Sequence, residues 1–201
     1  MITNPSEKDD IYLANVAKIG NSTNNIQYIE NVLPEKDHKA LIDYIKIAES
    51  WEEQPWKAIT IQAQNLPEEI LEILTRVFKI VYKKSVDLYD VEINPFNKSA
   101  LHIVKFVKGF YLEPHVDTLS YEGNHIASVY YINDDYSGGE INFPNHKLEI
   151  KPKPNSLIIF PGNENYLHEV REILDNNRYS SAMWFQFTGS SFNKKAEWYN
   201  I

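Results

Sequence analysis

The sequence predicts an α+β protein that is mainly β, in which helices come first and a β-rich module follows. In the first half, residues 35–50 and 67–88 place apolar residues at the spacing of three and four that is typical of a helix. From about residue 100, short β-rich runs alternate with turn residues. No repeat, low-complexity tract or Gly/Ser linker interrupts the chain. We therefore expect residues 1–201 to form a single domain.

Each helical segment has an apolar face and a recognisable pattern of charge. The apolar positions of the first are Leu41, Ile42, Tyr44, Ile45 and Ile47. The apolar stripe of the second is broader and comprises Ile70, Ile73, Leu74, Val77, Phe78 and Val81. Pro67, Glu68 and Glu69 suit a first turn, where proline loses no hydrogen bond and acidic side chains meet the positive end of the helix dipole.

The second half reads as a series of short strands. The runs are LHIVKFV before Gly109, IASVYYI before the turn at 133–135, SLIIF before Pro161-Gly162, and the closing YSSAMWFQF. Because no helical segment separates these strands, the pattern favours an antiparallel sandwich or barrel.

Composition and charge exclude several classes of protein. The 201 residues include no cysteine, so disulfides, zinc ribbons, iron–sulfur clusters and thiol nucleophiles are excluded, and a metal would need His, Asp or Glu ligands. A net charge of −8 provides no positive field for nucleic acid or an anionic membrane. The start lacks the pattern of a secretory signal, and no run is apolar enough to span a bilayer. We expect a cytoplasmic protein that binds neither nucleic acid nor membrane.

Two histidines and one aspartate form the candidate metal site. In His115-Val116-Asp117 the first and third residues point to one face of an extended chain, so both can reach one cation. His168 follows the SLIIF strand. Two histidines and one carboxylate on separate strands would form a facial triad, which leaves coordination positions open and is typical of non-haem iron oxygenases. The alternative for His115 and Asp117 is a loop histidine beside a solvated acid.

Arg178 is the candidate anion-binding residue. The chain has 17 lysines but only three arginines, and Arg178 opens an apolar strand. A guanidinium can bind a planar carboxylate through two hydrogen bonds, which lysine cannot reproduce. The alternative is a salt bridge to a neighbouring acid such as Asp175.

The ordered motifs resemble the catalytic module of the 2-oxoglutarate- and Fe(II)-dependent dioxygenases, in the prolyl 4-hydroxylase-like branch. The matching motifs are Gly109 six residues before HVD, YYIN at 130–133, GGEINFP at 138–144, the IKPKPNSLIIFP strand pair, HEV at 168–170 and RY at 178–179. The resemblance implies a double-stranded β-helix (jelly-roll, cupin-like) core at residues 100–188. Residues 1–99 would form a mainly helical lead-in packed on one sheet, and 189–201 a tail.

The resemblance also implies roles for individual residues. His115, Asp117 and His168 match the catalytic iron ligands, and Arg178 matches the residue that pairs with the distal carboxylate of 2-oxoglutarate. Tyr131 matches a position that bonds the same carboxylate in some relatives; the alternative is a tyrosine packed in an aromatic core. Ser180, two residues after Arg178, is a further candidate donor. The implied cofactors are Fe(II), 2-oxoglutarate and O2, with ascorbate as a candidate reductant.

Two departures from the family pattern bear on the substrate. Phe106 stands where many prolyl hydroxylases have a tyrosine, so one hydrogen bond is missing. Trp184 stands where the nucleic-acid dealkylating branch has a second arginine, which argues against that branch.

The sequence leaves three functions open. The first is hydroxylation of a C–H bond, with a peptidyl proline as the expected substrate. The second is hydroxylation of a free amino acid or small metabolite, and the third is a metal-binding β-barrel without turnover. We expect substrate choice to lie in the segments 118–124 and 51–64, which contain Tyr121 and Trp56.

Overall fold

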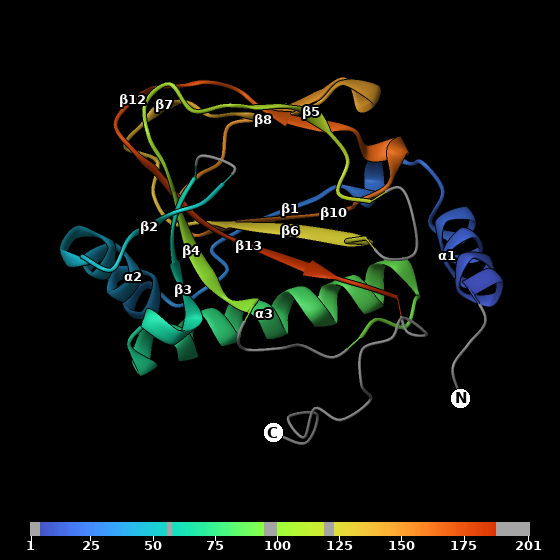
Figure 1. Cartoon of the computed structure of the whole chain (residues 1–201), viewed down its shortest axis with the longest axis horizontal. Coiled ribbons are helices and arrows are strands. Elements are labelled where there is room, and N and C mark those ends of the chain that lie inside the picture. The colour runs from blue at the N-terminus through green and yellow to red at the C-terminus, as the bar shows by residue number, and fades with distance from the viewer. Residues whose placement is uncertain (1–4, 56–57, 95–99, 119–122, 188–201) are drawn as a thin grey trace.

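The computed structural model describes residues 5–55, 58–94, 100–118 and 123–187. Two antiparallel sheets face each other, and helices cover the outer face of the larger one (Figure 1). Both sheets are open, so the sandwich, and not the closed barrel, is the arrangement that the chain adopts.

Three α-helices precede the β-rich module: α1 (Pro5–Ile19), α2 (Glu35–Ile47) and α3 (Glu68–Tyr89). α3 runs beneath the larger sheet (Figure 1). It begins after Pro67, with Glu68 and Glu69 in the first turn as predicted, and ends at Asp90, which adopts the left-handed conformation. None of the helices among the described residues has an apolar stretch long enough to cross a membrane.

The larger sheet has seven strands in the order β1-β10-β6-β13-β4-β3-β2. The strands are β1 (Gln27–Glu30), β2 (Glu52–Glu53), β3 (Ile59–Gln62), β4 (His102–Phe106), β6 (Ile126–Tyr131), β10 (Ser156–Pro161) and β13 (Arg178–Phe185). The four predicted runs form β4, β6, β10 and β13 at its centre.

The smaller sheet has the order β5-β11-β8-β9, and a two-stranded ribbon, β12-β7, continues the same layer (Figure 1). Its strands are β5 (Leu112–His115), β8 (Ile141–Phe143), β9 (Leu148–Ile150) and β11 (His168–Val170). The ribbon consists of β7 (Ser137–Gly138) and β12 (Ile173–Asp175).

The central strands are buried on both faces, which explains why their sequences are nearly continuous apolar runs. In β10, Leu157 and Ile159 pack against the helices, whereas Ile158 and Phe160 belong to the core between the sheets. The two tyrosines of β6 divide in the same way: Tyr130 lies on the helix side and Tyr131 on the inner side. The larger sheet thus separates a supporting core from an inner layer.

The N-terminal half contributes more to the sheet than the sequence indicated. β1 pairs with β10, and β3 pairs with β4, so residues from the helical lead-in extend both edges of the larger sheet. Part of the segment 51–64, which we expected at the mouth of the site, is therefore strand β3, where Ile61 is fully buried. Trp56 and Tyr121 lie outside the described residues.

Candidate active site

A small, mainly apolar pocket of about 90 Å³ lies between the two sheets. Strand β13 contributes alternate residues to it, namely Arg178, Ser180, Ala182 and Trp184. This alternation follows from the two-residue period of a strand, which points every second side chain toward the same face. The other polar residues in the wall are His115, Asp117, His168 and Tyr131. All five residues predicted for the site therefore line one pocket.

The two candidate histidines are neighbours on adjacent strands of the smaller sheet. His115 on β5 and His168 on β11 are direct antiparallel partners, and their ring centroids are 4.3 Å apart. In each ring Nδ1 is engaged by a backbone carbonyl: Glu113 O at 2.8 Å from His115 and Tyr166 O at 3.1 Å from His168. Because Nδ1 donates to these carbonyls, Nε2 is the nitrogen of each ring that remains available to bind a metal.

Asp117 lies in the loop after β5 and completes the cluster. The backbone N–H groups of Asp117 and Thr118 both donate to Gly162 O, at 2.9 and 3.0 Å. A Cβ at Gly162 would lie 2.1 Å from Asn124 O and 3.0 Å from Asp117 Cβ, so only glycine allows this close approach. The loop is thereby held against the turn that follows β10.

The three side chains fit a metal ion. One ligand atom from each of His115, Asp117 and His168 lies within 4.8 Å of the others. Oδ2 of Asp117 is buried without a hydrogen-bond partner and lies 3.9 Å from His168 Nε2. Two imidazole nitrogens and one carboxylate oxygen are a donor set that suits Fe(II) and leaves coordination positions open.

Burial changes the protonation behaviour of two of these groups. Burial raises the pKa of Asp117 to about 6, against opposing contributions from His115 and a side-chain hydrogen bond from Trp184. Burial and the neighbouring His115 lower the pKa of His168 to about 3, so this imidazole is neutral at physiological pH. Both shifts have the sign expected for charges that lack a compensating partner, and a bound cation would reverse the penalty on the carboxylate.

Arg178 is a buried cation, only 2% exposed, at the other end of the pocket. Its Nη1 donates to Gly139 O at 3.0 Å, and its guanidinium lies 4.6 Å from the ring centroid of Phe106 and 5.5 Å from that of Tyr131. None of the ion pairs found in the described part of the chain includes Arg178.

The alternative partner, Asp175, forms no ion pair with Arg178 among the described residues, and its Oδ1 instead accepts the backbone N–H of Ser137. A buried arginine of this kind is costly without an anion, which is the property expected of a binding site for a carboxylate ligand.

Tyr131 and Ser180 lie beside Arg178. They are direct partners across β6 and β13, and both are buried, with Tyr131 only 1% exposed. Burial raises the pKa of Tyr131 to about 12, against the opposing field of Arg178, so the hydroxyl remains a donor. Tyr131 also packs in the inner core, so the two interpretations of this residue, hydroxyl donor and packed aromatic, are compatible.

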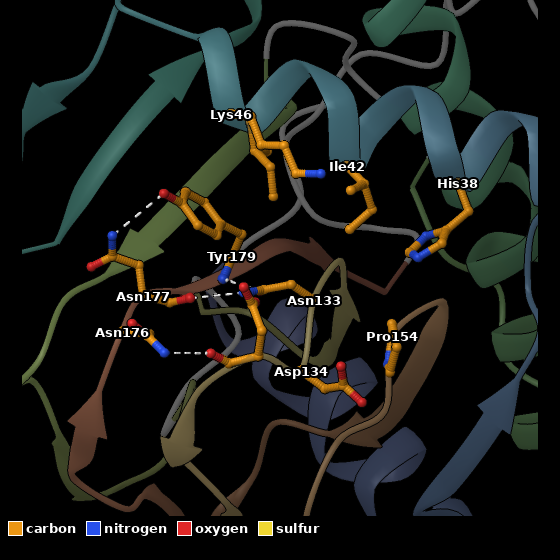
Figure 2. A pocket seen from close by; sticks show the side chains of 11 residues that line it. His38, Ile42, Lys46, Asn133, Asp134, Pro154, Asn176, Asn177 and Tyr179 are labelled. Atoms are coloured by element: carbon orange, nitrogen blue, oxygen red, sulfur yellow. Dashed lines mark hydrogen bonds between the residues drawn. The ribbon is translucent and has the colours of Figure 1, made fainter.

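A hydrogen-bond network fixes the backbone at the start of β13. The side chain of Asn133 accepts the backbone N–H of Tyr179 at 2.7 Å and donates to Asn177 O at 2.8 Å, while Asn176 donates to Asp135 O. Figure 2 shows this network in the wall of a separate pocket of about 520 Å³ beside α2. The turn before Arg178 is thus tied to the loop after β6.

Trp184 has a role that the sequence did not reveal. Trp184 donates a side-chain hydrogen bond to Asp117, and its ring stacks on His102 with centroids 6.0 Å apart. From the sequence, Trp184 was notable only because it stands where the nucleic-acid dealkylating branch has an arginine. Its even spacing from Arg178 along β13 was the available signal that it faces the same pocket.

The family comparison agrees with this geometry. The family model described as the 2OG-Fe(II) oxygenase superfamily matches residues 101–186, which is the β-rich module. This family implies Fe(II), 2-oxoglutarate and O2. No curated protein sequence matches the chain significantly.

Solved structures of prolyl hydroxylases are similar to the chain at low sequence identity. A *Pseudomonas putida* prolyl-4-hydroxylase has a TM-score of 0.67 and 16% identity, covering 89% of this chain and 98% of its own. A prolyl hydroxylase from *Trichoplax adhaerens*, in complex with a hypoxia inducible factor peptide fragment, has a TM-score of 0.65 and 18% identity, with coverage of 90% and 91%.

A third structure is the viral collagen prolyl hydroxylase of Paramecium Bursaria Chlorella virus-1 in its 2OG complex, with a TM-score of 0.61, 17% identity and coverage of 81% and 95%. These likenesses confirm the predicted double-stranded β-helix fold. The β-rich module thus matches the 2OG-Fe(II) oxygenase superfamily, and the fold of the chain is similar to that of solved prolyl hydroxylases.

Proposed function

We propose that the protein is a 2-oxoglutarate/Fe(II)-dependent dioxygenase that couples oxidative decarboxylation of 2-oxoglutarate to hydroxylation of a peptidyl proline. The observation that carries the proposal is the pairing, in one small pocket, of an open His-Asp-His cluster with a buried arginine that lacks a carboxylate partner. One end of the pocket suits a metal, and the other suits an anion.

At the metal end, His115, Asp117 and His168 would hold Fe(II) through Nε2, Oδ2 and Nε2. When bound with 2-oxoglutarate and O2, the iron supplies the oxidising chemistry that breaks an unactivated C–H bond. The protein orients the ligands by the backbone bonds at Nδ1 of each histidine and by the hydrogen bond from Trp184 to Asp117. The apolar wall keeps bulk water away from this centre.

At the other end, Arg178 would bind the distal carboxylate of 2-oxoglutarate, and Tyr131 would donate a hydrogen bond to it. The pocket is small, about 90 Å³, which favours a compact cosubstrate at this end over a large ligand. The carboxylate would compensate the buried charge of Arg178, which is the reason for keeping an unpaired arginine at this depth.

A prolyl peptide is supported as the substrate by the similarity of the fold to three prolyl hydroxylases, one of them solved with a peptide. A net charge of −8 disfavours a polyanionic substrate. Phe106 stacks on Phe110 with centroids 4.0 Å apart and supplies no hydroxyl, so substrate contacts here differ from those of relatives with a tyrosine. Ascorbate belongs to the proposal as an accessory reductant.

The test is incubation of the protein with Fe(II), 2-oxoglutarate, O2 and proline-containing peptides, followed by mass spectrometry and a succinate assay. We expect a gain of one oxygen atom on the peptide with equimolar succinate, and no product from His168→Ala. Turnover of free proline without turnover of peptides would support the small-molecule alternative. If the wild type gives no succinate with any substrate and no slow decay of 2-oxoglutarate, the dioxygenase proposal is wrong and the non-catalytic alternative stands.

A further inference from the structure

Two buried polar atoms next to the proposed cosubstrate site lack a hydrogen-bond partner. Nε of Arg178 and the hydroxyl of Tyr136 are both inaccessible to solvent and unpaired within the described part of the chain. A buried donor or acceptor left without a partner costs free energy, so such atoms are rare in folded proteins. One of the two, the guanidinium Nε–H, can only donate, whereas a tyrosine hydroxyl can accept.

The two side chains lie against the same backbone residue. A Cβ built on Gly139 would lie 3.1 Å from Cε2 of Tyr136 and 3.5 Å from Cδ of Arg178. The unpaired hydroxyl is two bonds from Cε2, and the unpaired Nε is one bond from Cδ. The charge of Arg178 also acts on Tyr136, where it opposes the rise in pKa that burial causes. The two unpaired atoms therefore belong to side chains that pack against the same glycine.

The ring of Tyr136 is held firmly while its hydroxyl is unpaired. Lys151 places Nζ 4.2 Å from the ring centroid and donates to the backbone carbonyls of Tyr136 and Gly138. The opposite surroundings are apolar, because Tyr136 packs in a cluster with Phe106, Phe110 and Ile173. A phenylalanine could make the same packing contacts, so packing does not explain why this position has a hydroxyl.

We propose that Tyr136 is a positioning residue for Arg178: when 2-oxoglutarate binds, the Tyr136 hydroxyl accepts the Nε–H of the guanidinium and aims the remaining N–H groups at the distal carboxylate of 2-oxoglutarate. Gly139 O already holds Nη1 at 3.0 Å, so a second acceptor at Nε would fix the plane of the guanidinium. A neutral acceptor suits this task, because a carboxylate there would compete with the cosubstrate for the positive charge. This inference rests on the proposed function of the pocket.

The experiment compares Tyr136→Phe with a matched control, Tyr130→Phe. Tyr130 is also fully buried, but its hydroxyl donates to Asn155 on the helix side of the sheet. Binding of 2-oxoglutarate to the Mn(II)-loaded proteins is measured by calorimetry, together with binding of 2-oxopentanoate, which has the same chain length but ends in a methyl group. Turnover kinetics are measured in parallel with Fe(II).

In Tyr136→Phe we expect the dissociation constant of 2-oxoglutarate to rise about tenfold, the loss typical of a hydrogen bond to a charged group. Binding of 2-oxopentanoate should be unchanged, since it does not use Arg178. The KM for 2-oxoglutarate should rise while kcat at saturation stays within about twofold. Tyr130→Phe should bind both ligands as the wild type does.

The result that overturns the assignment is wild-type affinity for 2-oxoglutarate in Tyr136→Phe, or an equal loss for both ligands, which would indicate a damaged pocket. Thermal unfolding of the ligand-free variants checks the fold independently: loss of an unpaired hydroxyl should leave the melting temperature of Tyr136→Phe equal to or above that of the wild type. If the wild type itself does not bind 2-oxoglutarate, the proposed function fails and the role of Tyr136 with it.

Discussion

At the scale of single residues, the pocket places ionisable side chains where the ligand-free protein gains nothing from their charge. Asp117 is the clearest case: its side chain is 11% exposed, its Oδ2 is unpaired, and burial is the main cause of its raised pKa. A residue of this kind lowers the stability of the metal-free protein and raises that of the metal-bound protein, which is common in ligand-binding sites.

Asp117→Asn should therefore stabilise the ligand-free protein. The folded carboxyl has a pKa of about 6 against 3.8 for the ordinary group, so the folded state holds its proton more tightly and wild-type stability falls as pH rises through this range. Asparagine removes this effect, and the variant should be more stable than the wild type by about 2–3 kcal/mol above pH 6.

The difference should shrink as pH falls and vanish below about 3.8, where both proteins carry a neutral group. Urea unfolding of both proteins, freed of metal by a chelator, across this pH range measures the difference. Mn(II) binding should be lost in the variant. Lower stability of Asp117→Asn at neutral pH would contradict the argument that burial disfavours the carboxylate.

At the scale of elements, the turn that carries Gly138 and Gly139 joins β7 to β8. Gly139 O in this turn accepts the hydrogen bond from Arg178 Nη1. Both glycines adopt positive φ, 72° at Gly138 and 68° at Gly139. Space is a second requirement, because a Cβ at Gly138 would lie 1.9 Å from the backbone carbonyl oxygen of Glu172. Backbone atoms in a paired ribbon cannot move aside as a side-chain end can.

Gly138→Ala and Gly20→Ala separate these two requirements. Gly20 has the same kind of conformation, with φ of 68°, but nothing lies within 4 Å of a Cβ there. We expect Gly20→Ala to cost about 1 kcal/mol from the left-handed conformation alone. Gly138→Ala should cost roughly 3 kcal/mol or more, because a backbone clash adds to the same strain. Denaturant unfolding measures both, and equal losses would show that crowding at Gly138 is unimportant.

The elements also show how far a sequence can predict this fold. The two periodic helices and the four long apolar strands were found within about three residues of their ends, since each buries enough surface to impose a pattern on its own sequence. Helix α1 and strands β1 and β3 were not found. β1 and β3 have four residues each, too few for a clear alternation, and their pairing with β10 and β4 defines them as strands.

The site residues likewise include some that the sequence predicts and some that it does not. His115, Asp117, His168 and Arg178 were predicted from residue type, spacing and order, and the structure brings them into one pocket. Trp184 and Tyr136 were not predicted as site residues, because their importance lies in a hydrogen bond to Asp117 and in an unpaired hydroxyl near Arg178. Neither property leaves a local sequence pattern.

At the scale of the whole molecule, the larger sheet links stability to the site. Its outer face packs with all three helices into one core, and its inner face presents Arg178, Ser180 and Tyr131 to the pocket. A rigid support of this kind allows the inner face to carry an uncompensated charge, since the outer core contributes stability that does not depend on the pocket.

Ligand binding should consequently raise the stability of the entire molecule, and only when Arg178 is present. With Mn(II) bound, 2-oxoglutarate at a hundred times its dissociation constant should add about 2.7 kcal/mol, which corresponds to a rise of roughly 5–10 °C in melting temperature for a chain of this size. Arg178→Met should show no such rise with 2-oxoglutarate, although Mn(II) alone should still stabilise it, because the three metal ligands are unchanged.

The ligand-free Arg178→Met protein should be at least as stable as the wild type, since methionine fills similar space without a buried charge. Arg76→Met is the matched control: Arg76 is a partly exposed arginine that pairs with Asp37 and does not line the pocket, so its loss should leave the response to 2-oxoglutarate intact. Thermal unfolding of the three proteins with and without each ligand makes the comparison. A full 2-oxoglutarate response in Arg178→Met would mean that the dicarboxylate binds elsewhere, because no other cation among the described residues lines this pocket.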